Sequence, residues 1–306
     1  MGKRGTDRIR DRVVVVTGAS SGIGRAVALA FARRGARLVL AARSGAALDE
    51  VARRCAAAHR AADALAVPTD VTDAGAVDAL AAALARHGRI DVWVNVAGVG
   101  ILGHADRTPS EDVRRLLDVN VMGVVHGAGA AVPVMRRQGS GVLIDVSSVL
   151  GGVVRAPYMS AYAMSKAALV TFDDVLRQEL ALAGARGVSV CTVLPGGVDT
   201  PFFRHAANHT GRSVRALPPV VRPERVARAV VRAAKHRPRR VVVGLFARFL
   251  VRAHAVAPGV VRAAIGRRTD RHYLSRFGET PAEPVTTGVL YVPSGDTAAR
   301  DGGGGG

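Results

Sequence analysis

The sequence VVVVTGASSGIGRA, residues 13–26, joins an apolar run of strand length to a glycine-rich turn and then to a helical pattern. Four consecutive valines predict a strand buried on both faces, because a half-exposed strand alternates apolar and polar residues. Gly18, Gly22 and Gly24 allow the backbone to turn sharply and to approach a ligand closely. Such a turn at the start of a helix suits a pyrophosphate, which the free N–H groups of the first helical turn can bind.

The same alternation continues along the first two hundred residues. Apolar runs of strand length alternate with longer helical patterns, which indicates a parallel sheet covered by helices. Right-handed crossovers make such a sheet doubly wound. The expected fold class is therefore α/β, a single Rossmann-like doubly wound parallel sheet with helices on both faces. The predicted strands are 13–18, 38–43, 64–70, 90–98, 141–148, 188–196 and 239–244, and the predicted helices are 24–34, 45–60, 73–87, 109–137, 159–182 and 223–236.

Composition divides the chain into four parts. Residues 1–11 are a charged N-terminal tail, and residues 12–244 are expected to form the dinucleotide-binding and catalytic domain. Within it, residues 201–222 lack periodicity and predict a loop over the site. Residues 245–278 form a basic amphipathic C-terminal extension, and residues 279–306, which end in a run of glycines, predict an irregular and flexible tail.

The bulk composition excludes several classes of protein. Of 306 residues 49% are hydrophobic and 4% aromatic, so small aliphatic side chains should form the core. The net charge is +19, but the arginines are spread along the chain without the aromatic interleaving of a nucleic-acid-binding module, so no nucleic-acid partner is expected. Cys55 and Cys191 lie far apart in apolar surroundings, which predicts no disulfide framework and no metal site, and favours a cytoplasmic location.

A second short stretch, AYAMSK at residues 161–166, carries candidate chemistry. Tyr162 and Lys166 are four residues apart in a predicted helix, so their side chains share one face. A phenol has a pKa of ~10, and a nearby ammonium lowers it toward the range useful for proton transfer. Lysine occurs only at Lys3, Lys166 and Lys235 in a chain rich in arginine. Taken alone, the pair would also suit an amphipathic surface helix.

The order of the motifs resembles that of the short-chain dehydrogenase/reductase family over about residues 12–200. The spacing Gly-x-x-x-Gly-x-Gly differs from the commoner dinucleotide spacing and is similar to that of this family. The matching motifs are the glycine turn, Asp70, Asn95-Val96-Ala97-Gly98, Asn120, Ser148, Tyr162-x-x-x-Lys166 and Pro195-Gly196. The resemblance implies an oxidoreductase that interconverts an alcohol and a ketone or aldehyde with a nicotinamide cofactor.

The resemblance also implies a role for each of four catalytic residues. Ser148 would hydrogen-bond the substrate oxygen, and Tyr162 would donate or accept its proton. Lys166 would bind the nicotinamide ribose and tune Tyr162, and Asn120 would hold the helix geometry and a water that resupplies protons. The interval from Ser148 to Tyr162 is one residue longer than is usual in the family, which leaves Ser147 as an alternative to Ser148.

The end of the second strand indicates the cofactor. An NAD site usually ends this strand with an acidic residue, whereas residues 41–44 read Ala-Ala-Arg-Ser. Arg43 could pair with a 2′-phosphate, so NADP(H) is favoured over NAD. Asp70 and Val71 match the adenine-contacting position of the family, although the stretch also suits a helix N-cap. The expected cofactor-binding residues are Gly18, Ser20, Ser21, Gly22, Ile23, Gly24, Arg43, Asp70, Val71, Asn95, Ala97, Gly98, Tyr162, Lys166, Pro195, Gly196, Val198 and Thr200.

Apolar residues in 99–108, 149–160 and 201–222 indicate an apolar carbonyl or alcohol as substrate, and a preference for NADPH would make reduction the physiological direction. A non-catalytic NADP-binding regulatory protein is the alternative, although it would not need the full catalytic set. The resemblance implies a homo-oligomer. The stretch LFARFLVRAHAV, residues 245–256, is basic and amphipathic, and packing on the core or on another subunit is favoured over contact with an anionic membrane surface.

Overall fold

A seven-stranded parallel sheet forms the centre of the computed structural model, which describes residues 9–59, 62–82, 88–274 and 284–293. The strand order is β3-β2-β1-β4-β6-β7-β9, so the chain runs outward from β1 to β3 and then returns to β4 on the other side of β1. This reversal confirms the predicted doubly wound sheet. The strands are β1 (Val13–Thr17), β2 (Arg37–Ala42), β3 (Asp63–Pro68), β4 (Val92–Asn95), β6 (Gly141–Val146), β7 (Val188–Pro195) and β9 (Arg240–Val243).

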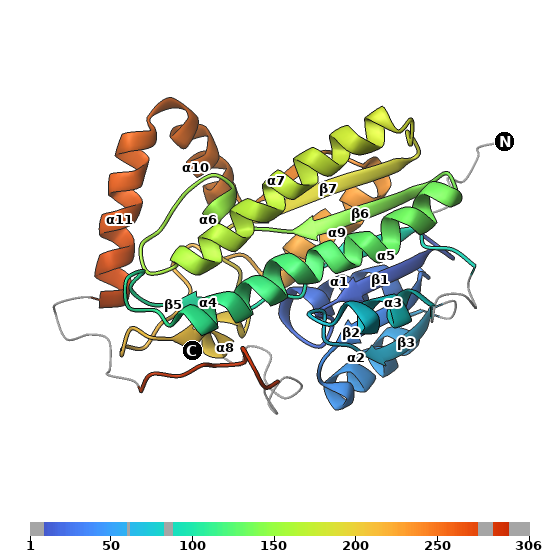
Figure 1. Cartoon of the computed structure of the whole chain (residues 1–306), viewed down its shortest axis with the longest axis horizontal. Helices are drawn as coiled ribbons and strands as arrows, with labels where there is room; N and C mark the ends of the chain where they lie inside the picture. The colour runs from blue at the N-terminus through green and yellow to red at the C-terminus, as the bar shows by residue number, and fades with distance from the viewer. Residues whose placement is uncertain (1–8, 60–61, 83–87, 275–283, 294–306) are drawn as a thin grey trace.

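Helices cover both faces of the sheet (Figure 1). One face carries α1 (Gly22–Ala32), α2 (Gly45–Ala58) and α9 (Pro223–His236), and the other carries α3 (Ala74–Ala82), α5 (Gly123–Arg137) and α7 (Ser160–Leu182). The two faces hold separate apolar clusters. Val14 and Val16 of β1 belong to the cluster with α1, α2 and α9, whereas Val13 and Val15 belong to the opposite one. The four valines are therefore buried on both faces, as their uninterrupted run predicts.

The predicted helix over 109–137 is interrupted in the middle. It consists of α4 (Ser110–Leu117), a π-helical turn η2 (Asp118–Met122) and α5. Asn120 lies in the π-helical turn, and such turns occur frequently at functional sites. Within the described part of the chain, residues 110–137 are the one stretch long and apolar enough to span a membrane, and half of the tested window is buried inside the protein, as in a core helix.

The other predicted elements are present but mostly shorter. The predicted strand 90–98 is reduced to β4, and residues 83–87 of the predicted helix 73–87 lie outside the described residues. The predicted loop 201–222 contains a short helix, α8 (Phe202–His205), and a short strand, β8 (Ala207–Asn208). Strand β8 pairs in parallel with β5 (Ile101–Leu102), which ties this loop to the chain that follows β4.

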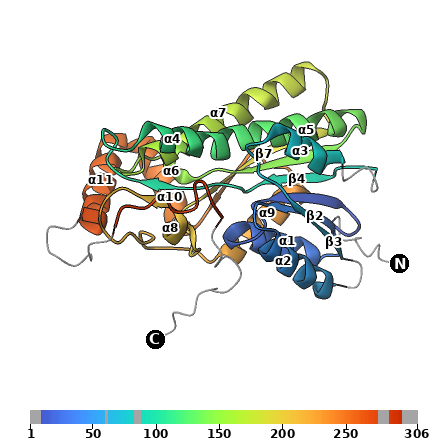
Figure 2. The same cartoon turned by 60° about the horizontal axis from the view of Figure 1, so that its bottom comes forward.

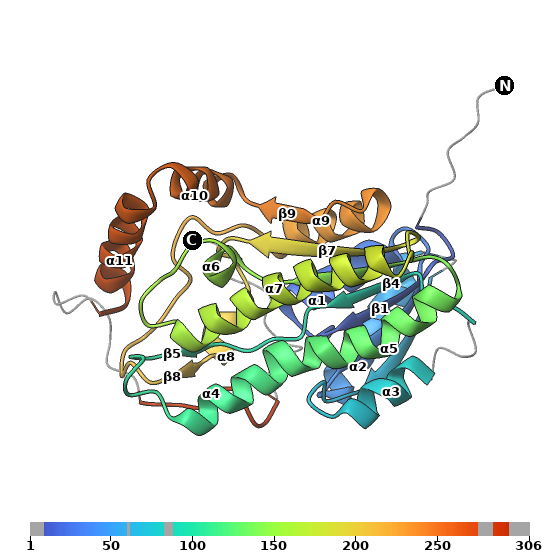
Figure 3. The same ribbon diagram turned by 45° about the horizontal axis from the view of Figure 1, so that its top comes forward.

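The C-terminal extension forms two helices, α10 (Leu245–Val256) and α11 (Pro258–Leu274); α10 lies beside the β9 edge of the sheet, and α11 packs against α10 farther from the sheet (Figure 3). Residues 245–256 are helical, as expected, whereas α11 was not predicted. Helix α10 buries Ala247 against the domain and leaves Phe249 63% exposed. The extension therefore packs on the domain through one side only.

Residues 284–293, here called the C-terminal segment, pack against the domain. They contain turns, bends and one isolated antiparallel bridge from Thr286 to Asn208 of β8. Leu290 is fully buried in the apolar cluster on the α3, α5 and α7 face. Figure 2 shows this segment, in dark red, passing close to α8. The remaining parts of the predicted tails, 1–8, 279–283 and 294–306, lie outside the described residues.

Leu290→Ala should release the C-terminal segment while the sheet stays folded. Removal of a buried leucine side chain costs about 2–5 kcal/mol, and this segment has few other buried apolar residues. Hydrogen exchange should show faster exchange across 284–293 with a small change in Tm. Leu48→Ala, on the buried face of α2, should instead lower Tm strongly. Unchanged protection of the segment in Leu290→Ala would contradict this prediction.

Candidate active site

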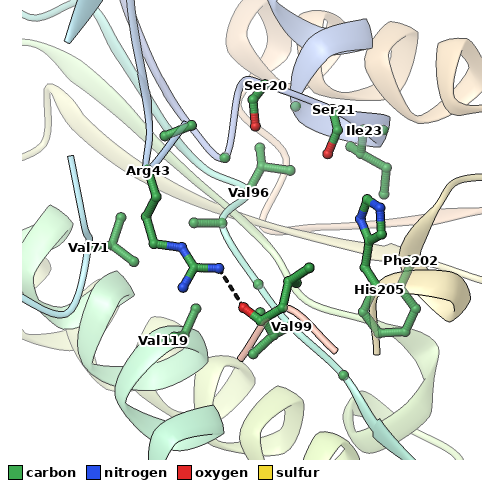
Figure 4. Close-up of a pocket in the computed structure, with 18 of the residues that line it drawn as sticks. Ser20, Ser21, Ile23, Arg43, Val71, Val96, Val99, Val119, Phe202 and His205 are labelled. Atoms are coloured by element: carbon green, nitrogen blue, oxygen red, sulfur yellow. Dashed lines mark hydrogen bonds between the residues drawn. The ribbon is translucent and has the colours of Figure 1, made fainter. Parts of the chain in front are cut away.

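A pocket of about 220 Å³ lies where the strand order reverses, at the carboxyl ends of β1, β2 and β4. A parallel sheet places its ligand crevice at this point. The glycine turn, the ends of these strands, helix α8 and the C-terminal segment line the pocket. Figure 4 shows Arg43 on one side of it and Phe202 and His205 on the other, with Ser20 and Ser21 between them at one end.

The glycine turn has the geometry that a phosphate requires. Gly18 has φ +66°, and a Cβ atom there would lie 2.7 Å from the backbone of Ala97. A Cβ on Gly24 would lie 2.0 Å from the carbonyl oxygen of Gly18, so neither position accepts a side chain. The N-cap residue Ser21 makes no side-chain cap and the first turn of α1 has no acidic residue. The N–H groups and the helix dipole can therefore bind an anion, so this turn fits a dinucleotide pyrophosphate.

Arg43, at the end of β2, extends along the rim of the pocket. Its guanidinium donates hydrogen bonds to three carbonyl oxygens of the C-terminal segment, those of Val289 (2.5 Å), Leu290 (3.2 Å) and Tyr291 (3.3 Å). The dashed line in Figure 4 marks the first of these bonds. Burial lowers the pKa of Arg43, and the charge of nearby Asp70 opposes this shift. No pattern in the sequence predicted that the C-terminal segment would bind Arg43.

Asp70 follows β3 and lines the pocket. Its Oδ1 accepts hydrogen bonds from the N–H (3.0 Å) and the hydroxyl (2.9 Å) of Thr72, and its Oδ2 accepts one from Arg115 (2.9 Å). Burial acts to raise the pKa of Asp70, but these hydrogen bonds outweigh it and hold the pKa below its usual value. The cap of α3 is Asp73, whose Oδ1 accepts from the N–H of Ala76, so the N-cap interpretation of Asp70 is wrong.

Tyr162 and Lys166 share one face of α7, as predicted. Lys166 is 5% exposed, and its Nζ donates to the carbonyl oxygen of Val146 (3.0 Å) and lies 5.7 Å from the centroid of the Tyr162 ring. Burial lowers the pKa of Lys166 to about 8, opposed by Asp145. Burial raises the pKa of Tyr162 to about 12, although a hydrogen bond with Ser148 opposes the shift. The expected lowering of the phenol pKa is therefore wrong, because burial dominates.

The two serines after β6 have different partners. Ser147 donates its hydroxyl hydrogen to the carbonyl oxygen of Lys166 (2.7 Å), which joins β6 to α7. Ser148 accepts a hydrogen bond from the N–H of Leu150 (3.1 Å), and its hydroxyl acts to lower the pKa of Tyr162. Ser147 lines the pocket and Ser148 does not, so the effect on Tyr162 supports Ser148, whereas the pocket lining keeps Ser147 as the alternative.

Asn120 connects three elements beneath the pocket. Its Nδ2 donates to the carbonyl oxygen of Val99 (3.0 Å) and to the hydroxyl of Ser165 (3.0 Å), and its Oδ1 accepts from the N–H of Val99 (2.8 Å). The side chain is fully buried. Asn120 therefore fixes the π-helical turn against α7 and against the loop that follows β4.

Comparison with known proteins decides the family. The model of the short chain dehydrogenase family matches residues 12–211. The chain belongs to the short-chain dehydrogenase/reductase family. An uncharacterized oxidoreductase of Bacillus subtilis, YxnA, is 36% identical over 296 residues, which cover 93% of this chain and 79% of YxnA.

Two solved structures of this family are similar and differ in their cofactor. An alcohol dehydrogenase from Thermococcus sibiricus, complexed with 5-hydroxy-NADP, has a TM-score of 0.66 and 27% identity, covering 76% of this chain and 96% of that one. A short chain dehydrogenase/reductase from Burkholderia phymatum, in complex with NAD, has a TM-score of 0.73 and 28% identity. The match covers 83% of this chain and 96% of that one. The likeness therefore shows a nicotinamide-binding family without distinguishing NADP from NAD.

Most of the cofactor residues expected from the family resemblance line the pocket. These are Gly18, Ser20, Ser21, Gly22, Ile23, Gly24, Arg43, Asp70, Val71, Ala97, Gly98, Tyr162, Lys166 and Thr200. Asn95 does not, because its side chain turns into the core, where it accepts from the Trp93 indole and donates to Asp145 (both 2.8 Å). Pro195, Gly196 and Val198 also lie outside the lining. Residues 195–198 instead pair with neighbouring backbone. The N–H of Gly196 donates to the carbonyl oxygen of Val243, and Val198 forms an isolated β-bridge with Val221.

Some lining residues lie outside the expected cofactor-binding set. Phe202, one of the apolar residues of the loop 201–222 expected to carry the substrate, packs edge-to-face on Tyr162, with the ring centroids 5.3 Å apart. His205, beside it on α8, was not anticipated. Val289 and Pro293 of the C-terminal segment carry no local sequence signal.

A buried pair of carboxyl groups, Asp145 and Asp173, lies behind Lys166 of this short-chain dehydrogenase/reductase. Both side chains are fully buried, and Thr192 donates to Asp173 (2.5 Å). Asp145 Oδ2 and Asp173 Oδ1 receive no hydrogen bond from a donor in the described residues. Burial and then the charge of Asp173 raise the pKa of Asp145 well above its usual range, so we predict that the two carboxyl groups share one proton. Sequence reasoning missed this pair.

Asp145→Asn should remove a pH dependence of stability. An unfolded aspartate has a pKa of ~3.9, so between this value and the raised pKa only the folded state keeps the proton. The stabilisation is complete below the unfolded pKa and is lost as the pH rises, with a slope of up to about 1.4 kcal/mol per pH unit. Asparagine supplies a permanent donor. Urea unfolding should show the variant to be more stable than the wild type at pH 8 and less pH-dependent.

Exposed Asp49→Asn is the matched control, and it should leave the slope unchanged. An equal slope in Asp145→Asn and the wild type would rule out the shared proton.

Proposed function

We propose that this protein is an NADP(H)-dependent reductase of an apolar ketone or aldehyde. The observation that carries the proposal is the convergence of Ser148, Tyr162 and Lys166 beside a pocket that fits a dinucleotide pyrophosphate. The apolar residues Val99, Val119 and Phe202 around this pocket support an apolar substrate. A cytoplasmic location and a homo-oligomeric state stay predictions from the sequence.

The residues of the site would act on the substrate oxygen. When bound, NADPH supplies the hydride. Ser148 would hold the carbonyl oxygen by a hydrogen bond, and Tyr162 would donate its proton to the same oxygen as negative charge develops there. A phenol with a pKa raised to about 12 is protonated at neutral pH, which suits a proton donor and therefore the reductive direction. Phe202 covers Tyr162 and would exclude water.

Lys166 and Asn120 would hold the reacting groups in place. Lys166 is fixed by the carbonyl oxygen of Val146 on the face of α7 that carries Tyr162, where it can reach a ribose hydroxyl. Asn120 holds the backbone of Val99, which lines the pocket, against α7. These two residues would therefore set the distance between the cofactor ribose and the phenol.

The end of β2 supports NADP over NAD. Residues 41–44 contain no carboxylate, and the guanidinium of Arg43 lies at the rim of the pocket. Carbonyl oxygens hold this guanidinium in the structure, and a phosphate is a stronger acceptor for it. We therefore propose that the guanidinium of Arg43 binds the 2′-phosphate of NADP(H).

Tyr162→Phe should lower kcat by about 10²–10⁴-fold, because the phenolic proton is lost while the ring is kept. Turnover of a panel of ketones and aldehydes is followed by NADPH absorbance at 340 nm, and NADPH affinity should stay within a few fold. Tyr158→Phe is the matched control, because the Tyr158 hydroxyl binds Asp270 outside the pocket. Retained turnover in Tyr162→Phe would overturn the mechanism, and tight NADPH binding without turnover by the wild type would favour a regulatory protein.

Arg43→Ala should discriminate between the two cofactors. Loss of a charge-assisted bond to the 2′-phosphate should raise KM for NADPH about tenfold or more, since such bonds contribute about 1.5–3 kcal/mol. KM for NADH should change little. Arg53→Ala, which removes an exposed arginine of α2 paired with Glu50, is the control. Equal increases of both KM values would contradict the assignment of Arg43.

A further inference from the structure

A second cavity, of about 390 Å³, lies between the C-terminal helices and the catalytic domain. Helices α10 and α11, the loop 217–221 and residues 149–159 form its walls. Most of the lining is apolar, with Leu150, Met159, Phe203, Ala247, Leu250 and Ile265 among the residues that contribute. The part that α10 and α11 supply falls outside residues 12–211, which match the family. The extension of this chain therefore supplies one wall of the cavity, and the catalytic domain supplies the others.

A single wall of side chains separates this cavity from the candidate active site. Phe202 lines the active-site pocket and packs on Tyr162, whereas Phe203 lines the second cavity. The two phenylalanine rings are in edge contact, with their centroids 5.4 Å apart. Leu150 also lines the cavity, and its N–H is bonded to Ser148. A molecule whose reacting carbon lies at Tyr162 would therefore extend into this cavity once the side chains of Phe202 and Phe203 rotate aside.

One polar group in the cavity wall has no partner. Thr269 of α11 is 1% exposed, and its hydroxyl oxygen makes no hydrogen bond within the described residues. Buried hydroxyls are nearly always hydrogen-bonded, so an orphaned one beside a cavity indicates a ligand that completes it. Two arginines also line the cavity. Arg268 donates to the carbonyl oxygen of Pro218 (2.6 Å) and lies over the ring of Phe246, and Arg225 is the second.

We propose that the second cavity receives the apolar body of the substrate, and that Thr269 donates a hydrogen bond to an oxygen at its far end. The inference rests on the proposed function and narrows its substrate class to a lipophilic ketone or aldehyde with an oxygen acceptor remote from the reacting carbonyl. The volume lies within the ~300–1,000 Å³ typical of small-molecule sites. The remote oxygen can belong to a hydroxyl or to a carboxylate.

Leu250→Trp tests the cavity by filling it. The variant should lower kcat/KM for 2-undecanone at least tenfold and leave kcat/KM for 2-butanone within about twofold, since only the longer ketone reaches the cavity. The matched control is Phe249→Trp, at the exposed neighbouring position of α10, which should change neither value. Circular dichroism verifies that both variants fold. Equal effects on the two ketones, or no effect on either, would overturn the proposal.

Thr269→Val tests the remote oxygen, because valine keeps the shape and removes the hydroxyl. The variant should reduce kcat/KM several-fold for 10-oxoundecan-1-ol or for 10-oxoundecanoic acid. The ketone whose kcat/KM falls shows whether the remote oxygen belongs to a hydroxyl or to a carboxylate. The variant should leave kcat/KM for 2-undecanone unchanged, because this ketone has no second oxygen. It should raise Tm, since an unpaired buried hydroxyl is removed. Unchanged kinetics with both oxygen-ended ketones would exclude Thr269 as a ligand.

A binding measurement separates failure of this inference from failure of the proposed function. Tyr162→Phe, which should not turn over, is titrated with the apolar fluorophore N-phenyl-1-naphthylamine, and 2-undecanone is then added. Displacement that is lost in the Tyr162→Phe/Leu250→Trp double variant supports the cavity even where the wild type reduces no ketone. If 2-undecanone displaces no fluorophore from Tyr162→Phe, the proposed role of the second cavity is wrong. The reductase assignment would then still be decided by the activity assays.

Discussion

The close approach between the glycine turn and the loop after β4 is the constraint on which the site depends. Gly18 lies so near the backbone of Ala97 that no side chain fits between them. The next residue, Gly98, lies against Asn120 and Lys166, where a Cβ would stand 3.3 Å from Asn120 Oδ1 and 3.5 Å from Lys166 Nζ. One continuous contact therefore runs from the helix N-terminus that would bind the pyrophosphate to the lysine beside Tyr162. Packing, and not a flexible linker, sets the spacing of the two ends of the cofactor site.

Burial sets the chemistry of the proposed catalytic residues as much as charge does. Lys166 lies between a backbone carbonyl oxygen and the carboxyl pair of Asp145 and Asp173, in a region where water is scarce. Desolvation makes its ammonium easier to deprotonate and makes the Tyr162 phenol harder to ionise. At neutral pH the Tyr162 phenol is therefore protonated, whereas Lys166, with a pKa of about 8, keeps most of its charge, which nearby Asp145 favours.

The sheet and the shared helix face of Tyr162 and Lys166 could be predicted because short-range patterns specify them, whereas Ser148 was expected only from the family resemblance. Uninterrupted valines demand burial on both faces, and a four-residue spacing on a helix fixes two side chains on one side. The direction of Asn95 could not be predicted, since it depends on Trp93 and Asp145 across the sheet. The raised pKa of Tyr162, the π-helical turn and the second cavity likewise result from packing between distant segments. Such contacts leave no mark on the spacing of residues along the chain.

The bond from Arg43 to Val289 joins residues 246 positions apart, almost the full length of the described chain. During synthesis, the central sheet can be complete, with β9 in place, while the residues that finish the rim of the pocket are still inside the ribosome. A nascent chain thus acquires its phosphate-binding turn early and its finished cofactor edge last. The order of translation thereby separates the formation of the fold from the completion of the rim of the pocket.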